Sequence, residues 1–154
     1  MADKTKTIEL LNEVLTAELT AINQYFLHAE LCQHWGYTKL YGTVRAQSIG
    51  EMKHAEEIME RILFLDGIPN VQRMSSIKVG ETVAEQFTLD LGLEQDAIPR
   101  LNEGIAHCRE VGDNGTAALL QRILESEEEH VEWLETQINL IGQLGEAAYL
   151  AQQI

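Results

Sequence analysis

Hydrophobic residues recur with helical spacing over four long segments of this chain, and this periodicity constrains the fold more than any other feature of the sequence. The segments run from about Thr5 to Trp35, from Thr38 to Asp66, from Thr82 to about Gly112 and from about Thr116 to Gly142. Long segments with this period are typical of amphipathic α-helices that bury one face against their neighbours. The chain is therefore predicted to be all-α, with residues 1–154 forming one domain.

The breaks between these segments predict how the helices connect. Gly36 and Gly112 are expected to end the first and third helices next to short turns. Residues 67–81 contain Pro, Asn, Ser and Gly without helical periodicity, and this stretch is long enough to cross a bundle from one end to the other. A short fifth helix is expected at 146–152, after Gly145. One long crossover between the second and third helices, together with two short turns, predicts the ferritin-like variant of the four-helix bundle.

Two local signals concern the third helix. Thr82 and Glu85 have the spacing of a capping box, which favours a helix start at this point. Pro99 lies inside the segment, where it removes one backbone hydrogen bond and is expected to kink the helix.

The charge of the chain narrows the classes of partner. Its 25 acidic and 11 basic residues give a formal net charge of −14, which disfavours nucleic acid and anionic membranes and favours cations. A run of about 18 apolar residues and the apolar stretch of a secretory signal are both absent from the sequence, so a soluble, cytoplasmic protein is expected. Cys32 and Cys108 form no CxxC pair, which excludes rubredoxin-like iron sites and thioredoxin chemistry. Both cysteines are expected to be small buried side chains.

Two Glu-x-x-His motifs carry the main chemical signal. They are Glu51 with His54 and Glu127 with His130, and an offset of 76 residues relates them, so the two helical hairpins resemble copies of each other. Glu and His at this spacing lie on the same helix face and can bind one ion. Such pairs also arise by chance, but both of these lie within the apolar stripes of their helices.

Glu18 and Glu94 also lie within apolar stripes, so four carboxylates and two imidazoles are predicted to point into the bundle. Confining four acids together costs several kcal/mol per ionised group unless protons or metal ions neutralise them, and no Lys or Arg lies on these stripes near them. A metal site is therefore favoured over a purely structural hydrogen-bond network. The glutamates off the stripes are expected to be solvated: Glu56, Glu57, Glu60, Glu128, Glu129 and Glu132.

The six inward groups suit two cations with mostly oxygen ligands, which favours iron or manganese over zinc. The predicted centre has Glu51 and Glu127 as bridges, Glu18 with His54 on one ion, and Glu94 with His130 on the other. Such a centre can take one electron from each of two ferrous ions and deliver both to dioxygen or peroxide. Ferroxidase activity is therefore the catalytic hypothesis.

Four stretches of the chain resemble those of bacterioferritins: 21–28 (AINQYFLH), 51–55 (EMKHA), 61–65 (RILFL) and 125–136 (ESEEEHVEWLET). The resemblance extends over nearly the whole length. It implies a hollow 24-subunit shell, built from two-fold dimers, that stores a ferric mineral and carries a ferroxidase centre at the six positions above. It also implies a small ferredoxin as the partner for iron release.

The resemblance further implies haem b between two-fold related subunits, with Met52 of each subunit as an axial ligand. From the residues alone Met52 would be a packing methionine, although its side chain turns about 100° away from that of Glu51, toward a neighbouring subunit. Tyr25 matches a family position near the di-iron centre, where it is implied to donate an electron; an aromatic core residue is the alternative.

The chain departs from the family pattern at two positions. Some members carry a histidine and an aspartate on the inner side of the second helix, where this chain has Ala46 and Gly50. Neither residue can ligate iron, so a site of that type is not expected here, and iron would pass through the ferroxidase site itself.

Three other functions are compatible with the sequence. A haem-bearing electron-transfer assembly would use the six groups for a structural metal. A di-iron oxidase or peroxidase without a shell would resemble rubrerythrin relatives, although the chain lacks a cysteine-rich rubredoxin module. A helical interaction protein without a metal would leave the four inward acids unexplained.

Overall fold

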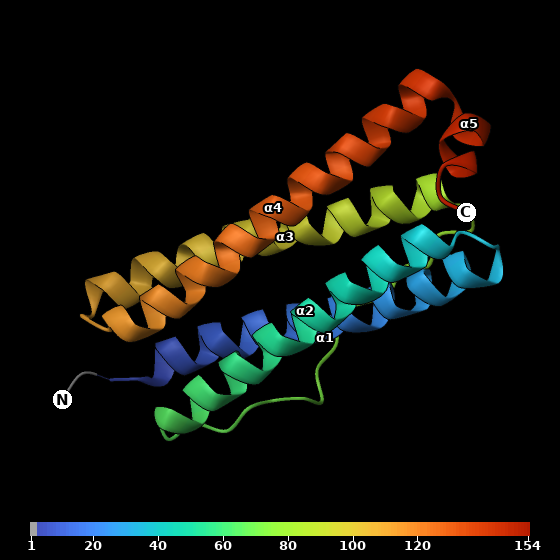
Figure 1. The fold of residues 1–154 in the computed structure, drawn as a ribbon. Coiled ribbons are helices and arrows are strands. Elements are labelled where there is room, and N and C mark those ends of the chain that lie inside the picture. The colour runs from blue at the N-terminus through green and yellow to red at the C-terminus, as the bar shows by residue number, and fades with distance from the viewer. Residues whose placement is uncertain (1–2) are drawn as a thin grey trace.

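The computed structural model describes residues 3–154, which form a bundle of four long helices closed at one end by a short fifth helix (Figure 1). The helices are α1 (Thr5–His34), α2 (Thr38–Phe64), α3 (Val83–Glu110), α4 (Asn114–Leu144) and α5 (Glu146–Ala151). In Figure 1 the chain between α2 and α3 runs the length of the bundle. The predicted all-α fold with one long crossover and a short C-terminal helix is confirmed.

The helix ends follow the signals in the sequence. Gly36 and Gly112 adopt positive φ angles of 91° and 80° after α1 and α3, a conformation that glycine enters without a steric penalty. The Oγ1 atom of Thr82 accepts a hydrogen bond from the backbone N–H of Glu85 at 3.2 Å, so α3 is capped where the sequence predicted. Pro99 lies on the exposed side of α3, which continues past it.

The interior is apolar toward both ends of the bundle and polar in the middle. One hydrophobic cluster, which includes Leu11, Ile58 and Leu120, fills the end near the α3–α4 turn. Another, built around Phe87, Leu134 and Tyr149, fills the end covered by α5. Cys32 and Cys108 are buried within these two clusters, as expected, and both are free thiols. Between them a small cluster of Ala21, Tyr25, Ala29 and Val44 lies beside the buried polar side chains of α1.

The crossover is held against the bundle by polar side chains of α1. Four backbone N–H groups of the crossover donate to them: Asn70 to Asn12 at 2.7 Å, and Ser75 to Thr20, Lys78 to Gln24 and Gly80 to His28 at 3.0 Å each. The accepting residues fall on one face of α1 because they are four or eight residues apart. This face therefore fixes the path of a segment that has no secondary structure of its own.

Arg61 joins the two helical hairpins at the end of the bundle near the α3–α4 turn. From α2 it donates to Thr116 Oγ1 at 2.8 Å and to Asp113 Oδ1 at 3.0 Å, at the start of α4. Its guanidinium also lies 4.5 Å from the centre of the Phe64 ring.

None of the helices in residues 3–154 has the length and apolar character needed to cross a membrane.

Candidate metal centre

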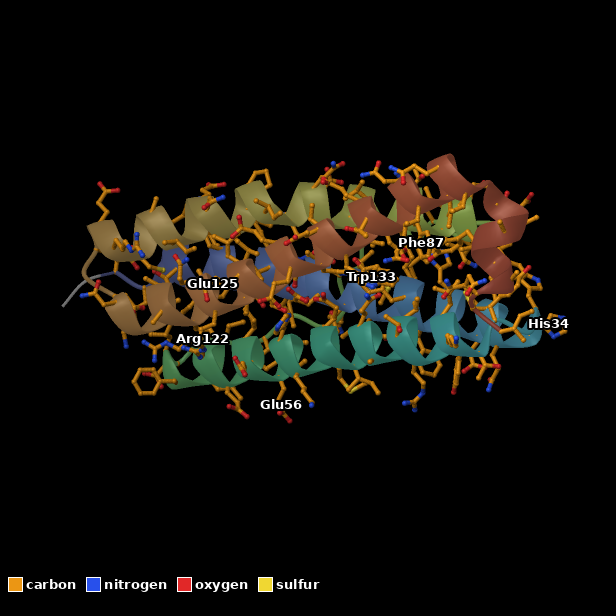
Figure 2. The ribbon with its side chains drawn as sticks, turned by 45° about the horizontal axis from the view of Figure 1, so that its top comes forward. His34, Glu56, Phe87, Arg122, Glu125 and Trp133 are labelled. Carbon is orange, nitrogen blue, oxygen red and sulfur yellow. The ribbon has the colours of Figure 1, made fainter. Side chains whose placement is uncertain are left out.

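The six predicted ligands meet in the polar middle of the bundle, and all four long helices contribute to them. The four carboxylates are buried, with exposed fractions of 1–5% for Glu18, Glu51, Glu94 and Glu127. His130 is 8% exposed and the His54 side chain 16%. The glutamates expected on solvated faces are exposed, and Glu56 points away from the bundle in Figure 2. The apolar stripes therefore predicted correctly that these four glutamates turn inward.

The inward groups form two overlapping clusters in which the potential ligand atoms lie within 4.8 Å of one another. One cluster contains Glu18, Glu51, His54 and Glu127; the other contains Glu51, Glu94, Glu127 and His130. Glu51 and Glu127 belong to both. Two cations placed in these clusters would share the carboxylates of Glu51 and Glu127, which is the arrangement that the sequence predicted for bridging ligands.

Several atoms of the centre lack a hydrogen-bond partner although they are buried. They are Glu18 Oε2, Glu94 Oε2, Glu127 Oε1, His54 Nδ1 and His130 Nε2. His54 Nδ1 lies 3.2 Å from Glu127 Oε1 and 3.7 Å from Glu18 Oε2, so these atoms surround the same space. Buried polar atoms without partners are costly, and a cation between them would remove that cost. The donor set of carboxylate oxygens and imidazole nitrogens fits iron.

The confinement of these acids changes how they bind protons. Burial raises the pKa of Glu18 from 4.5 to about 6. Burial also raises the pKa of Glu51 and Glu94 well above the ordinary range, and that of Glu127 to a smaller extent. Burial opposes a charge on His54, but the nearby carboxylates of Glu127, Glu18 and Glu51 outweigh it and raise the pKa of His54 to about 12. Without a metal, the centre therefore retains protons that a bound cation would displace.

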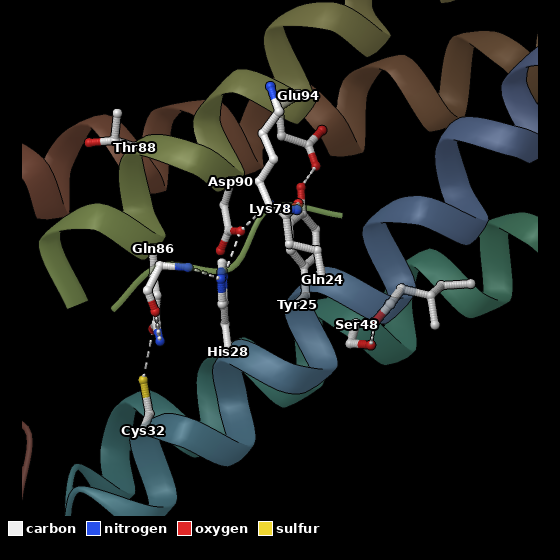
Figure 3. Close-up of polar contacts among 12 residues, drawn as sticks. Gln24, Tyr25, His28, Cys32, Ser48, Lys78, Gln86, Thr88, Asp90 and Glu94 are labelled. Atoms are coloured by element: carbon white, nitrogen blue, oxygen red, sulfur yellow. Dashed lines mark hydrogen bonds and ion pairs between the residues drawn. The ribbon is translucent and has the colours of Figure 1, made fainter. Parts of the chain in front are cut away.

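Tyr25 touches the centre from α1. Its hydroxyl donates a hydrogen bond to Glu94 Oε1 (Figure 3). Its ring lies edge-on to His130, with 5.1 Å between the ring centres. Burial and the nearby carboxylates, Glu94 first among them, raise the pKa of Tyr25 well above 10. The phenol is therefore neutral and holds one carboxylate oxygen of the second cluster in place.

A second buried polar group, which was not predicted from the sequence, lies next to the centre. His28 Nδ1 lies 2.9 Å from Asp90 Oδ1, and Gln24 donates to the same oxygen at 2.9 Å (Figure 3). Since His28 Nε2 accepts from Gly80, its Nδ1 carries the proton that Asp90 accepts. The signal was present, because these residues also lie at inward helical positions, but the path of the crossover was needed to explain them.

Two openings flank the centre on opposite sides of the bundle. A narrow cavity of about 70 Å³ lies between α1, α3 and the crossover, and all four glutamates of the centre line it. A wider pocket of about 600 Å³ lies between α2 and α4, where Ala46, Gly50, His54 and His130 are among the lining residues. Arg100 also lines the narrow cavity, from a position off the apolar stripe of α3.

Met52 lies outside the centre, on the surface of α2. Its side chain is 54% exposed and lines an apolar groove of about 300 Å³ together with Leu19, Ile22, Met59 and Leu63. The side chain thus turns away from the bundle interior, as expected one residue after Glu51.

Nearly the whole chain is similar in sequence and structure to the proteins of one family. The profile described as the Ferritin-like domain matches residues 8–144. Bacterioferritin BfrA of Mycobacterium tuberculosis is 54% identical over 145 residues, which cover 94% of this chain and 91% of that protein. The bacterioferritin of Streptomyces coelicolor is 52% identical over 149 residues, covering 97% and 89%. The solved structure of Mycobacterium tuberculosis BfrA superposes with a TM-score of 0.97 at 51% identity, covering 100% of this chain and 97% of that one.

Proposed function

We propose that this chain, which belongs to the ferritin family and within it to the bacterioferritins, oxidises ferrous iron between its four helices and stores the ferric product. The chain's membership of the bacterioferritins supports the iron-storage role. The observation that carries the oxidation step is the pair of overlapping clusters that share Glu51 and Glu127. Such a pair brings two ferrous ions close together, and two ions supply the two electrons that peroxide needs for reduction to water, or that dioxygen needs for reduction to peroxide.

The side chains of the centre would act first by binding and orienting the iron substrate. Glu51 and Glu127 would bridge the two ions. Glu18 with His54 would complete the coordination of one ion, and Glu94 with His130 that of the other. Iron binding would release protons from the acids whose pKa burial has raised and from His54. The catalytic set proposed for the chain is therefore Glu18, Glu51, His54, Glu94, Glu127 and His130.

Tyr25 would act as a reducing and positioning group beside this set. Its hydroxyl donates to Glu94, so an electron and a proton leaving the phenol would have a nearby acceptor for the proton. The ring also lies against His130. These contacts support the electron-donor role that the family resemblance implies.

The storage compartment would be a cytoplasmic, 24-subunit shell built from two-fold dimers. The exposed apolar groove around Met52 supports a shared haem b, because an outward-facing methionine on an apolar surface can meet its symmetry mate across a two-fold axis. Leu19, Ile22 and Met59 would contact the macrocycle. The haem would carry electrons inward for iron release, with a small ferredoxin as the donor.

Ferrous-iron oxidation by purified protein tests the centre. We expect rapid aerobic oxidation by a very large particle that also shows a haem absorption band. A Glu18→Gln, Glu94→Gln double variant is expected to lose at least about tenfold in initial rate while keeping the same elution volume, because one carboxylate of each cluster no longer ligates.

The matched control is Glu56→Gln with Glu128→Gln, which removes two exposed charges and should leave the rate unchanged. Equal rates in the double variant and the wild-type protein would exclude the proposed centre. A particle of one or two chains that still oxidises iron would favour a cage-free oxidase or peroxidase. Loss of the main activity on substitution of Met52, with the six ligands intact, would favour a haem-bearing electron-transfer assembly.

A further inference from the structure

The narrow cavity between α1, α3 and the crossover connects the centre with the outer surface of these helices. At its inner end are the four buried glutamates, and at its outer end Ser75 of the crossover and Asp96 of α3 are exposed. Ala17, Ala21 and Ala97 line the space between, and their small side chains leave room for a water-sized particle. Its volume of about 70 Å³ suits a small cation or a few water molecules rather than an organic ligand.

The ionisable groups that line this cavity are acids with one exception. Five are carboxyl groups, and Asp96 at the exposed outer end attracts a dication toward the four glutamates. Arg100 is the only cationic residue in the lining. It is half-buried, and it makes no ion pair within 4.0 Å among residues 3–154.

The position of Arg100 is therefore not explained by a salt bridge. A guanidinium that is held partly out of water without a carboxylate partner contributes little to stability. It does, however, place a fixed positive charge beside the path between Asp96 and the buried glutamates, one to two turns of α3 from Glu94. A charge at that point acts on any ion that passes.

We propose that Arg100 is an electrostatic brake on the entry of divalent cations through this cavity, opposing the attraction of Asp96 and of the glutamates. The inference rests on the proposed function, because it takes ferrous iron as the ion that enters. Arg100 acts on the approach of the ion and not on the bound state, so the number of ions held and the turnover at saturating iron are independent of it.

Arg100→Gln tests the brake. We expect the second-order rate constant for binding of Co²⁺, added to the anaerobic metal-free protein and followed by its visible absorption in a stopped-flow instrument, to rise about three- to tenfold at low ionic strength. The gain should shrink as salt is added, because exposed charges are screened. Asp96→Asn should change the rate constant in the opposite direction. The stoichiometry of bound Co²⁺ should remain that of the wild-type protein.

Arg109→Gln is the matched control, because it removes the same charge from the same helix. Arg109 is exposed and lines neither opening. An equal or lower rate constant for Arg100→Gln than for Arg109→Gln would overturn the brake, as would a gain that salt does not reduce. A wild-type protein that binds no Co²⁺ would overturn both the brake and the centre. Normal wild-type binding with no effect of Arg100→Gln would overturn the brake alone.

Discussion

Glu18 shows at the scale of one residue how the centre depends on pH. Its pKa is about 6 in the folded chain against an ordinary value of 4.5, because burial disfavours the carboxylate. A raised pKa contributes stability that is fully present below pH 4.5 and is lost as the pH rises through about 6. For Glu18 alone this loss is about 2 kcal/mol. The raised pKa of His54 has the same sign but another pH window: its contribution is full below pH 6.5 and is lost only as the pH rises toward about 12, so Glu18 accounts for the change around pH 6.

The thermal midpoint of the metal-free protein is therefore expected to be lower at about pH 7 than at about pH 5. A divalent cation should raise it more at the higher pH, because fewer protons then compete for the ligands. Scanning calorimetry with and without Co²⁺ measures both effects. In Glu18→Gln the difference in thermal midpoint between about pH 5 and about pH 7 should be smaller than in the wild-type protein. An unchanged difference would show that Glu18 does not titrate as its burial implies.

Individual residues also show where prediction from sequence succeeds. Glu18 and Glu94 could be found because a single acid in an apolar stripe has no other direction to face than inward. His28 and Asp90 could not, since their partners include the backbone of Gly80, and the path of the crossover does not follow from its composition. Arg100 was not predicted near the centre, because its side chain reaches a cavity that helical periodicity alone does not describe.

The ends of the elements were predicted closely wherever one residue has a local physical effect. Gly36 stops α1 and Thr82 caps α3, as the sequence indicated. The second helix ends at Phe64, two residues before the expected Asp66, which has a positive φ of 64° that an α-helix does not accommodate. The turn is closed by local backbone hydrogen bonds, from Asp66 N–H to Leu63 O at 3.0 Å and from Gly67 N–H to Ile62 O at 2.9 Å.

The junction between α2 and α4 depends on Arg61. Arg61→Gln is expected to lower the free energy of unfolding by about 1–2 kcal/mol, because two hydrogen bonds, one of them to a carboxylate, and the contact with Phe64 are lost. Arg122→Gln is the control, since its pair with Glu57 is exposed and 3.7 Å long, and the loss there should stay below about 0.5 kcal/mol. Chemical denaturation measures both losses. Equal losses of unfolding free energy in the two variants would show that the Arg61 contacts do not join the hairpins.

The end of the crossover should be sensitive to Gly80. A Cβ atom at this position would lie 2.5 Å from the backbone nitrogen of Gln86, so the segment must move and its hydrogen bond to His28 weakens. Gly80→Ala is expected to cost about 1–3 kcal/mol. Gly42→Ala, whose Cβ meets nothing within 4 Å inside α2, should instead stabilise by about 0.5–1 kcal/mol. Denaturation midpoints measure both, and a neutral Gly80→Ala would contradict the tight packing.

Over the whole molecule, the proposed function places oxidation and release at two separate sites. The six proposed ligands lie inside the bundle, where one chain supplies them all, whereas Met52 lies on the surface, where the proposed haem site would need a second copy to complete it. The sequence could predict the internal site because helical periodicity fixes which residues face each other within a chain. It could indicate the external one only through family resemblance, because a contact between copies leaves no period in the sequence of one.

This separation makes Met52→Leu a selective change. Leucine keeps the apolar groove but offers no sulfur, so the haem absorption band should be lost while the particle keeps its elution volume. The initial rate of ferrous-iron oxidation should stay within about twofold of the wild-type rate, because no ligand of the centre has moved. Reductive release of stored iron, followed with a ferrous chelator, should slow by at least about tenfold if the haem carries the electrons inward. Met59→Leu, in the same groove, is the control and should keep the haem. Slower oxidation with unchanged release would reverse these roles, and would mean that the surface methionine serves the buried centre instead of the stored mineral.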